Sequence, residues 1–151
     1  MYFWKTRNLA TDIKNGKISE YNKKNYFLAT SILALIAGII GQLSRSHIPQ
    51  SQVLVECLFF LIITIVGITI TFKTNKGNDG IDYVARMIAL SLPLLIKMAI
   101  MLFVFAAVIG IIDKKLGDNM TTLDWHTIGL ATILKIWLFW RLNVHLKYIN
   151  K

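Results

Sequence analysis

Four long stretches of apolar residues are the feature of this chain that most constrains its fold. They extend over residues 26–43, 53–72, 87–112 and 125–142. A helix needs about 20 apolar residues, at a rise of about 1.5 Å each, to cross a hydrocarbon layer about 30 Å thick. The sequence therefore predicts an all-α integral membrane protein, in which residues 26–142 form a bundle of four transmembrane helices.

The composition agrees with this interpretation. Hydrophobic residues make up 55% of the 151 residues, and the mean hydropathy is +0.55. A soluble domain of this length does not normally concentrate such residues into long runs with almost no charge. The third stretch is long enough to tilt or bend, and Pro93 inside it removes a backbone donor and favours a kink.

The flanking charges predict how the bundle is oriented. Twelve Lys and Arg residues lie in the first 25 residues, in the loop between the second and third stretches, and from Arg141 onward, whereas three lie in the other two loops. Cytoplasmic flanks collect Lys and Arg, so both ends of the chain are expected inside the cell. These flanks account for nearly all of the net charge of +9. The basicity therefore predicts contact with anionic lipid headgroups rather than with nucleic acid.

Residues 1–25 form a basic cytoplasmic tail, and residues 143–151 form a second, shorter one. Within the first tail, residues 4–14 are expected to make a short helix that ends at Asn15-Gly16. Its apolar residues form only a weak stripe. Two alternatives follow: an interfacial helix on the inner leaflet, anchored by the neighbouring aromatic residues, or a loosely ordered tail.

No catalytic or metal-binding constellation is evident, so no enzyme, no cofactor and no metal site is expected. Cys57 is the single cysteine, and the three histidines have no ligand spacing on one helix: His47, His126 and His145. The polar loop 74–82 faintly resembles a calcium loop, but Arg86 stands where the bidentate glutamate is required. We interpret this loop as a tight turn, with Asp82 capping the next helix and pairing with Arg86 one turn later.

Three charged residues inside the apolar stretches, Glu56, Lys97 and Lys135, are the candidate site residues. Each costs about 3 kcal/mol at the bilayer centre and therefore requires a partner or a function. Glu56 begins a stripe of aromatic, small and hydroxyl residues along its helix, and Lys135 lies on a similar face, so the two could meet. Lys97 could face a cavity at the Pro93 kink, pair with Glu56 or lie at a subunit contact. The three could line an ion or solute path, or fix the helix arrangement.

Rows of small residues four positions apart predict close contacts between helices. The helix-packing candidates are Thr30, Ala34, Ala37, Gly38, Gly41, Gly67, Ala106 and Gly110. These rows could serve packing within the bundle alone, or they could also build a complex.

The sequence thus favours a small membrane protein that acts through helix–helix association, as an accessory, assembly or immunity-type interaction protein. Its partner would be another membrane protein or further copies of itself. The alternative is a small oligomeric channel or transporter whose path is lined by Lys97, Lys135 and Glu56. A composition rich in Lys, Asn and Ile hints at a bacterial source, and hence at the inner (plasma) membrane.

Overall fold

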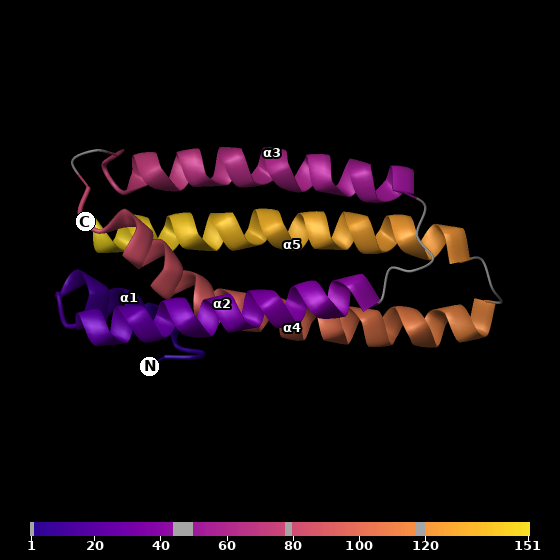
Figure 1. Ribbon diagram of the computed structural model, residues 1–151, viewed down its shortest axis with the longest axis horizontal. Helices are drawn as coiled ribbons and strands as arrows, with labels where there is room; N and C mark the ends of the chain where they lie inside the picture. Colours follow the sequence, from indigo (N-terminus) through magenta and orange to yellow (C-terminus); the bar gives the residue numbers. More distant parts are fainter. Residues whose placement is uncertain (1, 44–49, 78–79, 117–119) are drawn as a thin grey trace.

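The computed structural model is all-helical in the part of the chain that it describes, which is residues 2–43, 50–77, 80–116 and 120–151 (Figure 1). These residues form five helices and no strand. The helices are α1 (Thr6–Lys14), α2 (Glu20–Leu43), α3 (Gln50–Thr74), α4 (Tyr83–Leu116) and α5 (Met120–Ile149). The expectation of an all-α protein is confirmed, and each of the four apolar stretches lies within one helix.

Two of the described helices are long and apolar enough to cross a membrane, judged by length and composition. The qualifying segments are Ser51–Thr74 in α3 and Tyr83–Phe105 in α4. Only 11% of the first and 28% of the second are buried inside the protein. Their apolar sides therefore face outward, whereas a core helix of a soluble protein would be mostly buried.

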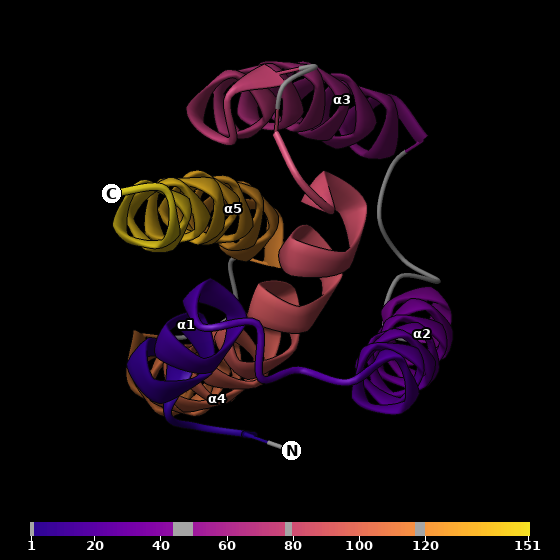
Figure 2. The same cartoon turned by 90° about the vertical axis from the view of Figure 1, so that its left-hand side faces the viewer.

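The long helices are packed in a row rather than in a closed ring. α3 packs against α5, α5 against α4, and α4 against α2, while the short helix α1 packs against both α4 and α5. Viewed from one end, α2 and α3 lie at opposite ends of this row (Figure 2). Among the described residues, α2 and α3 are not one of the packed pairs.

α4 changes direction along its length, as the position of Pro93 predicts. Its first turns run obliquely from the start of the helix, and the rest continues along the long axis of the molecule (Figure 1). Pro93 is fully buried, and a proline inside a helix removes one backbone hydrogen bond. The oblique first turns bring the start of α4 close to both α2 and α3.

The buried core lies at one end of the molecule, which we call the basic end. This end comprises α1, the first turns of α2 and α4, the last turns of α3 and α5, and the loop between α3 and α4. The core residues are Leu9, Ala10, Tyr26, Ala89, Leu90, Leu92, Leu94, Leu142, Leu146 and Ile149. They come from four different helices, so this end is packed much as a small soluble domain is.

The N-terminal tail forms a short helix that packs against the bundle. α1 forms, and it ends at Asn15-Gly16, where Gly16 adopts a φ of +65°. However, Thr6, Leu9 and Ala10 are buried against the bundle, at the spacing of one helical face. The apolar stripe of α1 is therefore covered by α4 and α5.

Candidate functional site

A polar network joins three segments at the basic end. The Nη1 atom of Arg86, in α4, donates to the Oδ1 atoms of Asn75 and Asn150, at 3.1 and 3.0 Å. Asn150 in turn donates to the carbonyl oxygen of Thr74 at 3.0 Å. Asn75 is fully buried. A single guanidinium thus holds together the end of α3, the start of α4 and the residue that follows α5.

The prediction that Asp82 pairs with Arg86 is wrong. Its carboxylate forms an ion pair with Lys23 of α2, at 2.8 Å, while Arg86 donates to the two asparagines described above. Asp82 has a φ of +48°, so it lies just outside the helix. Its carbonyl oxygen accepts a hydrogen bond from the Arg86 N–H at 2.9 Å. The hydrogen bond and the charge of Lys23 hold the pKa of Asp82 below its ordinary value.

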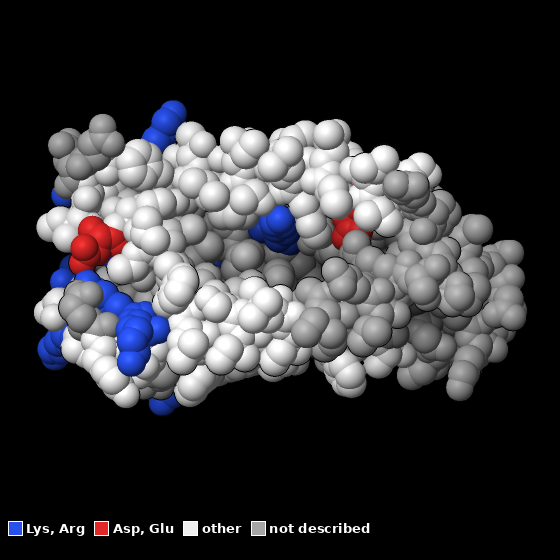
Figure 3. Space-filling view, viewed as in Figure 1, with Lys and Arg blue, Asp and Glu red and all other residues white. Residues whose placement is uncertain are grey.

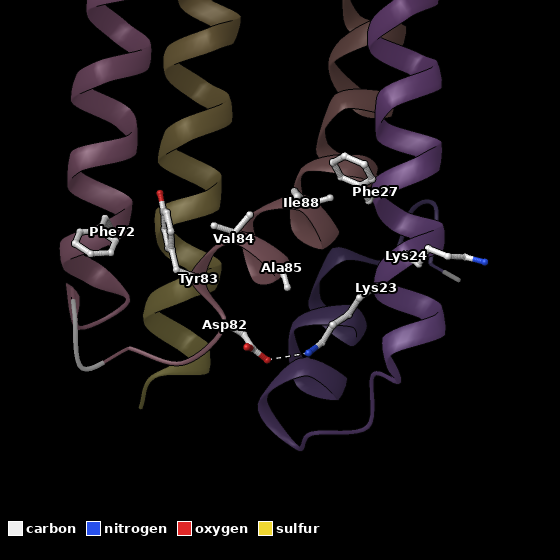
Figure 4. Close-up of a pocket in the computed structure, with 9 residues that line it drawn as sticks. All are labelled: Lys23, Lys24, Phe27, Phe72, Asp82, Tyr83, Val84, Ala85 and Ile88. Carbon is white, nitrogen blue, oxygen red and sulfur yellow. Dashed lines mark hydrogen bonds and ion pairs between the residues drawn. The ribbon is translucent and has the colours of Figure 1, made fainter.

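The Lys23–Asp82 ion pair lies beside an amphipathic pocket of about 650 Å³ between α2, α3 and α4 (Figure 4). Apolar side chains cover its walls: Phe27, Phe72, Val84, Ala85 and Ile88. Lys23 reaches across the opening to Asp82, whereas Lys24 points away from the pocket (Figure 4). A second pocket of about 400 Å³ shares Lys23 and Asp82 with the first. This arrangement of apolar walls with an ionic rim suits an amphiphilic molecule better than a small polar solute.

Lys97 is in contact with the N-terminal tail. Its Nζ atom donates to the hydroxyl of Thr6 at 3.1 Å and lies 5.2 Å from the ring centroid of Trp4. Thr6 is 3% exposed. Nothing in the sequence analysis paired Lys97 with this tail, although the spacing of Thr6, Leu9 and Ala10 could have indicated a docked helix.

The tail is fixed by further hydrogen bonds. The hydroxyl of Tyr2 donates to the carboxylate of Asp12 at 2.6 Å, and the Tyr2 N–H donates to the hydroxyl of Tyr26 at 2.7 Å. The hydrogen bond to Asp12, followed by the repulsion from its charge, raises the pKa of Tyr2. At the other end of α1, Lys14 lies over the ring of Tyr148, 5.2 Å from its centroid. α1 is therefore tied to both α2 and α5.

Glu56 and Lys135 lie in the interface between α3 and α5. Glu56 is 3% exposed, and the Nζ atom of Lys135 lies 4.3 Å from the ring centroid of Phe60, one turn away from Glu56. Glu56 also attracts Lys135 electrostatically. In the middle of the face seen in Figure 3, basic and acidic atoms are visible in the furrow between the helices, apart from the charged atoms at the left-hand end. The structure thus places Glu56 and Lys135 together, and Lys97 with α1.

The small residues that were candidates for helix packing lie on two different kinds of surface, one buried between helices and one exposed. Gly67 of α3 packs on Phe139 of α5, and a Cβ atom at this position would overlap the ring. Ala34 and Ala37 of α2, in contrast, are exposed. The hydroxyl of Thr30, at the start of that row, is buried with no hydrogen-bond partner among the described residues. The surroundings of four further candidates are not part of the described structure: Gly38, Gly41, Ala106 and Gly110.

Two basic residues of α5, Arg141 and His145, lie within electrostatic range of Lys97, which the sequence alone does not indicate. His145 is 7% exposed, and its Nε2 atom has no hydrogen-bond partner among the described residues. Burial lowers the pKa of His145 to about 4, and the charges of Arg141 and Lys97 act in the same direction. Arg141 lies one helical turn from His145, with its guanidinium 5.9 Å from the ring centroid of Trp140.

Comparison with models of protein families, with curated proteins and with solved structures gives no match for this chain. Within the described residues, no group of three or more His, Cys, Asp or Glu residues is placed to hold a metal ion. Any statement of function therefore depends on the geometry of this chain alone.

Proposed function

We propose that this protein is a multi-pass membrane protein that acts by binding a transmembrane helix of a partner membrane protein along α2. In this proposal all four long helices cross the membrane, and the basic end lies in the cytoplasm. The observation that carries it is the exposed small-residue face of α2, at Ala34 and Ala37, on a helix that packs against α4 and, among the described residues, not against α3 to a comparable extent.

The surroundings of this face suit a helix as its partner. Small residues allow two helix backbones to approach closely, which gains van der Waals contact where lipid offers no hydrophobic driving force. Large exposed side chains flank the small ones, among them Leu35 and Ile36. Surfaces that combine small and large side chains in this way can interdigitate with the side chains of another helix.

The proposal that α2 and α5 also cross the membrane is supported by their lengths of 24 and 30 residues. At about 1.5 Å per residue, both exceed a hydrocarbon layer of about 30 Å. The charge of Lys135 is sheltered from lipid by the ring of Phe60 and by the nearby carboxylate of Glu56. At the basic end, the amphipathic pockets beside Lys23 are suited to anionic lipid headgroups of the inner leaflet of a plasma membrane.

Site-specific crosslinking in native membranes tests the proposal. In a Cys57→Ser background, Ala34→Cys should give a discrete crosslinked product that contains the partner. Leu58→Cys, on the side of α3 away from α5, is the matched control and should give none. A product that contains only two copies of this chain would show that α2 binds a second copy of the protein rather than a different partner. Equal products at both positions, or none at Ala34→Cys, would contradict the proposal.

A large side chain in place of a small one provides a second test. Ala34→Leu should abolish co-purification of the partner in mild detergent, while Ala34→Gly should retain it, because only leucine prevents close approach of the backbones. Both variants should keep the helical content and unfolding midpoint of the wild type, since Ala34 is exposed. Retention of the partner by Ala34→Leu would show that it binds elsewhere.

Transport is the second candidate, favoured by one observation: Glu56 is buried at membrane depth within electrostatic reach of Lys135. A path through the α3–α5 interface would use both groups, with Lys135 as the group that attracts anions. Anion flux into proteoliposomes is the direct assay, with Glu56→Gln and Lys135→Met as the variants that should abolish it. Transport is excluded if the wild type shows no flux, or if the flux of both variants equals that of the wild type.

A further inference from the structure

The pocket between α2, α3 and α4 has its charged groups at one end and apolar side chains farther in. Lys23 and Asp82 meet at the end nearest to the loop between α3 and α4, whereas Phe27 and Ile88 lie farther along their helices (Figure 4). Phe27 follows Lys23 by about one helical turn, and Ile88 follows Asp82 by between one and two turns. In the proposed orientation, a phospholipid of the inner leaflet has the same order, with its headgroup toward the cytoplasm and its chains toward the bilayer centre.

The wall of the pocket on the side of α3 is fixed by contacts within the protein. The rings of Phe72 and Tyr83 pack edge to face, with their centroids 5.2 Å apart. The hydroxyl of Tyr83 lies 2.8 Å from the hydroxyl of Thr71, which is fully buried. The volume of about 650 Å³ is within the range of about 300–1,000 Å³ that is typical of ligand pockets. A ligand therefore finds this wall already formed, which lowers the cost of binding.

The pocket also lies where two helices are not joined directly. α2 packs on α4 and α3 packs on α5, so α2 and α3 face each other across the start of α4 (Figure 2). Phe27 of α2 and Val84 of α4 line this space, and both are exposed although they lie close to an ion pair. Exposed apolar surface with a charged rim is typical of a site that another molecule covers.

Positive charge predominates around the opening. Among the described residues that line the pocket, Lys23 and Lys24 are basic and Asp82 is the one acid. The neighbouring pocket of about 400 Å³ shares Lys23 and Asp82 and adds Lys14 and Arg86. Basic residues that gather beside a membrane attract anionic headgroups. The charges therefore favour an anionic amphiphile over a cationic or neutral one.

We propose that the pocket between α2, α3 and α4 binds one anionic phospholipid. Lys23 binds the phosphate, and an acyl chain lies against Phe27 and Phe72, so the lipid connects α2 to α3. An ammonium group has three N–H donors, which allows Lys23 to bind the phosphate and to keep Asp82 within reach. This site requires the membrane location of the proposed function but not the partner helix on α2.

Titration of lipid into purified full-length protein in a neutral detergent tests the site. Phosphatidylglycerol is added in mixed micelles, phosphatidylcholine with the same chains is the net-neutral control, and glycerol 3-phosphate represents a headgroup without chains. Native mass spectrometry counts the lipids retained, and the thermal unfolding midpoint reports their affinity. One phosphatidylglycerol should be retained and should raise the midpoint until the site is saturated. Phosphatidylcholine should bind about fivefold more weakly, and glycerol 3-phosphate should leave the midpoint unchanged.

Two variants that both break the ion pair should affect binding in opposite directions. Lys23→Gln removes the ammonium group and should weaken the binding of phosphatidylglycerol about fivefold or more. Asp82→Asn removes a competing carboxylate, so it should bind this lipid at least as tightly as the wild type does. Lys73→Gln removes an exposed charge at the same end but outside the pocket lining, and it should change the affinity by less than about twofold. Equal weakening by Lys23→Gln and Asp82→Asn would show that the ion pair is only structural and would overturn the proposal.

The apolar wall can be tested with a matched pair on α2. Phe27→Ala should weaken the binding of phosphatidylglycerol about threefold or more, since apolar contact with the chain is lost. Leu28→Ala, at an exposed position outside the lining, should change it by less than about twofold. The proposal is also overturned if phosphatidylcholine binds as tightly as phosphatidylglycerol, if glycerol 3-phosphate alone raises the midpoint, or if these two variants weaken binding equally. Crosslinking at Ala34→Cys is measured independently, so the lipid site and the partner-binding face can fail separately.

Discussion

At the basic end, four helices are joined by buried apolar side chains and by hydrogen bonds between elements, whereas in the middle of the molecule α2 and α3 each pack against a single long helix. Asn75, Arg86 and Asn150 are bonded to one another at the basic end. In the middle, α3 exposes most of its large side chains and contacts α5 through one stripe that includes Gly67. The two regions use different means to associate helices.

This difference follows from the surroundings that each region is built for. Burial of apolar surface stabilises a fold only where water is the alternative, and in the proposed orientation that condition holds at the basic end. Among lipid chains, helices associate through close packing and a few polar contacts. We therefore expect the stability of the fold to depend mainly on the basic end, and the open middle to remain available for a partner.

The largest expected effect comes from removing the guanidinium of the polar network. Arg86→Ala leaves Asn75 and Asn150 without their charged donor, and should lower the free energy of unfolding by about 3 kcal/mol. Unfolding in denaturing detergent, followed by circular dichroism, measures this loss. Lys73→Ala, which removes an exposed cation from the last turn of α3, should change it by less than about 0.5 kcal/mol. Similar losses for the two variants would show that the hydrogen bonds of Arg86 do not stabilise the basic end.

The next effect tests the middle of the molecule. Gly67→Val places two methyl groups against the ring of Phe139 and should destabilise the fold by about 1–3 kcal/mol. Ala37→Val, on the exposed face of α2, should leave the stability of the isolated protein within about 0.5 kcal/mol of the wild type. The double variant Gly67→Val/Phe139→Ala should recover part of the loss, because the smaller side chain makes room. A destabilising Ala37→Val would show that α2 is packed more tightly than its exposure indicates.

The sequence predicts the long helices well because a run of apolar residues of membrane length has few other ways to satisfy its backbone. The stripe on α3 from Glu56 through Gly67 is also visible in the sequence, since one face of a helix is fixed by its period. The docking of α1 is less visible. Thr6 and Ala10 are only weakly apolar, and their burial depends on Lys97 and on α5, which are far away in the chain.

The site at the basic end shows the limit of local reasoning most clearly. Asp82 has a basic residue four positions later, so Arg86 is its obvious partner in a helix. A φ of +48° places Asp82 outside the helix, where Lys23 of α2 forms the ion pair. The sequence likewise shows His145 without a partner on its own helix, because Lys97 acts on it only through the packing of α4 on α5.

The pH dependence of stability tests the basic end through His145, and its expected effect is of intermediate size. The pKa of His145 is lowered to about 4, from an ordinary value near 6.5, by burial and by the charges of Arg141 and Lys97. The unfolded chain therefore binds a proton more readily than the folded one. The folded state therefore has its full stability above about pH 6.5 and loses stability as the pH falls toward 4, and this loss reaches about 2 kcal/mol at pH 5.

Replacement of the histidine isolates this contribution. The unfolding midpoint of the wild type should fall between pH 7 and pH 5, and His145→Gln should show a smaller fall over the same range, because glutamine does not titrate. The other histidines of the chain are present in both proteins, so their contribution cancels in the difference between the two curves. Parallel curves would mean that His145 keeps an ordinary pKa, and thus that its surroundings are more polar than the structure shows.

The smallest expected effect concerns the ion pair that connects α2 to the start of α4. The side chains of Lys23 and Asp82 are 23% and 52% exposed, and an ion pair this accessible to solvent contributes less than about 1 kcal/mol. Because the pKa of Asp82 is lowered, this contribution is present at neutral pH and is lost as the pH falls through the folded-state value. A double-mutant cycle with Lys23→Ala and Asp82→Ala measures the coupling, and added salt should reduce it. A coupling well above 1 kcal/mol would mean that α2 belongs to the rigid basic end. A small coupling leaves α2 as the least constrained of the long helices, which is what an exposed partner-binding face on it requires.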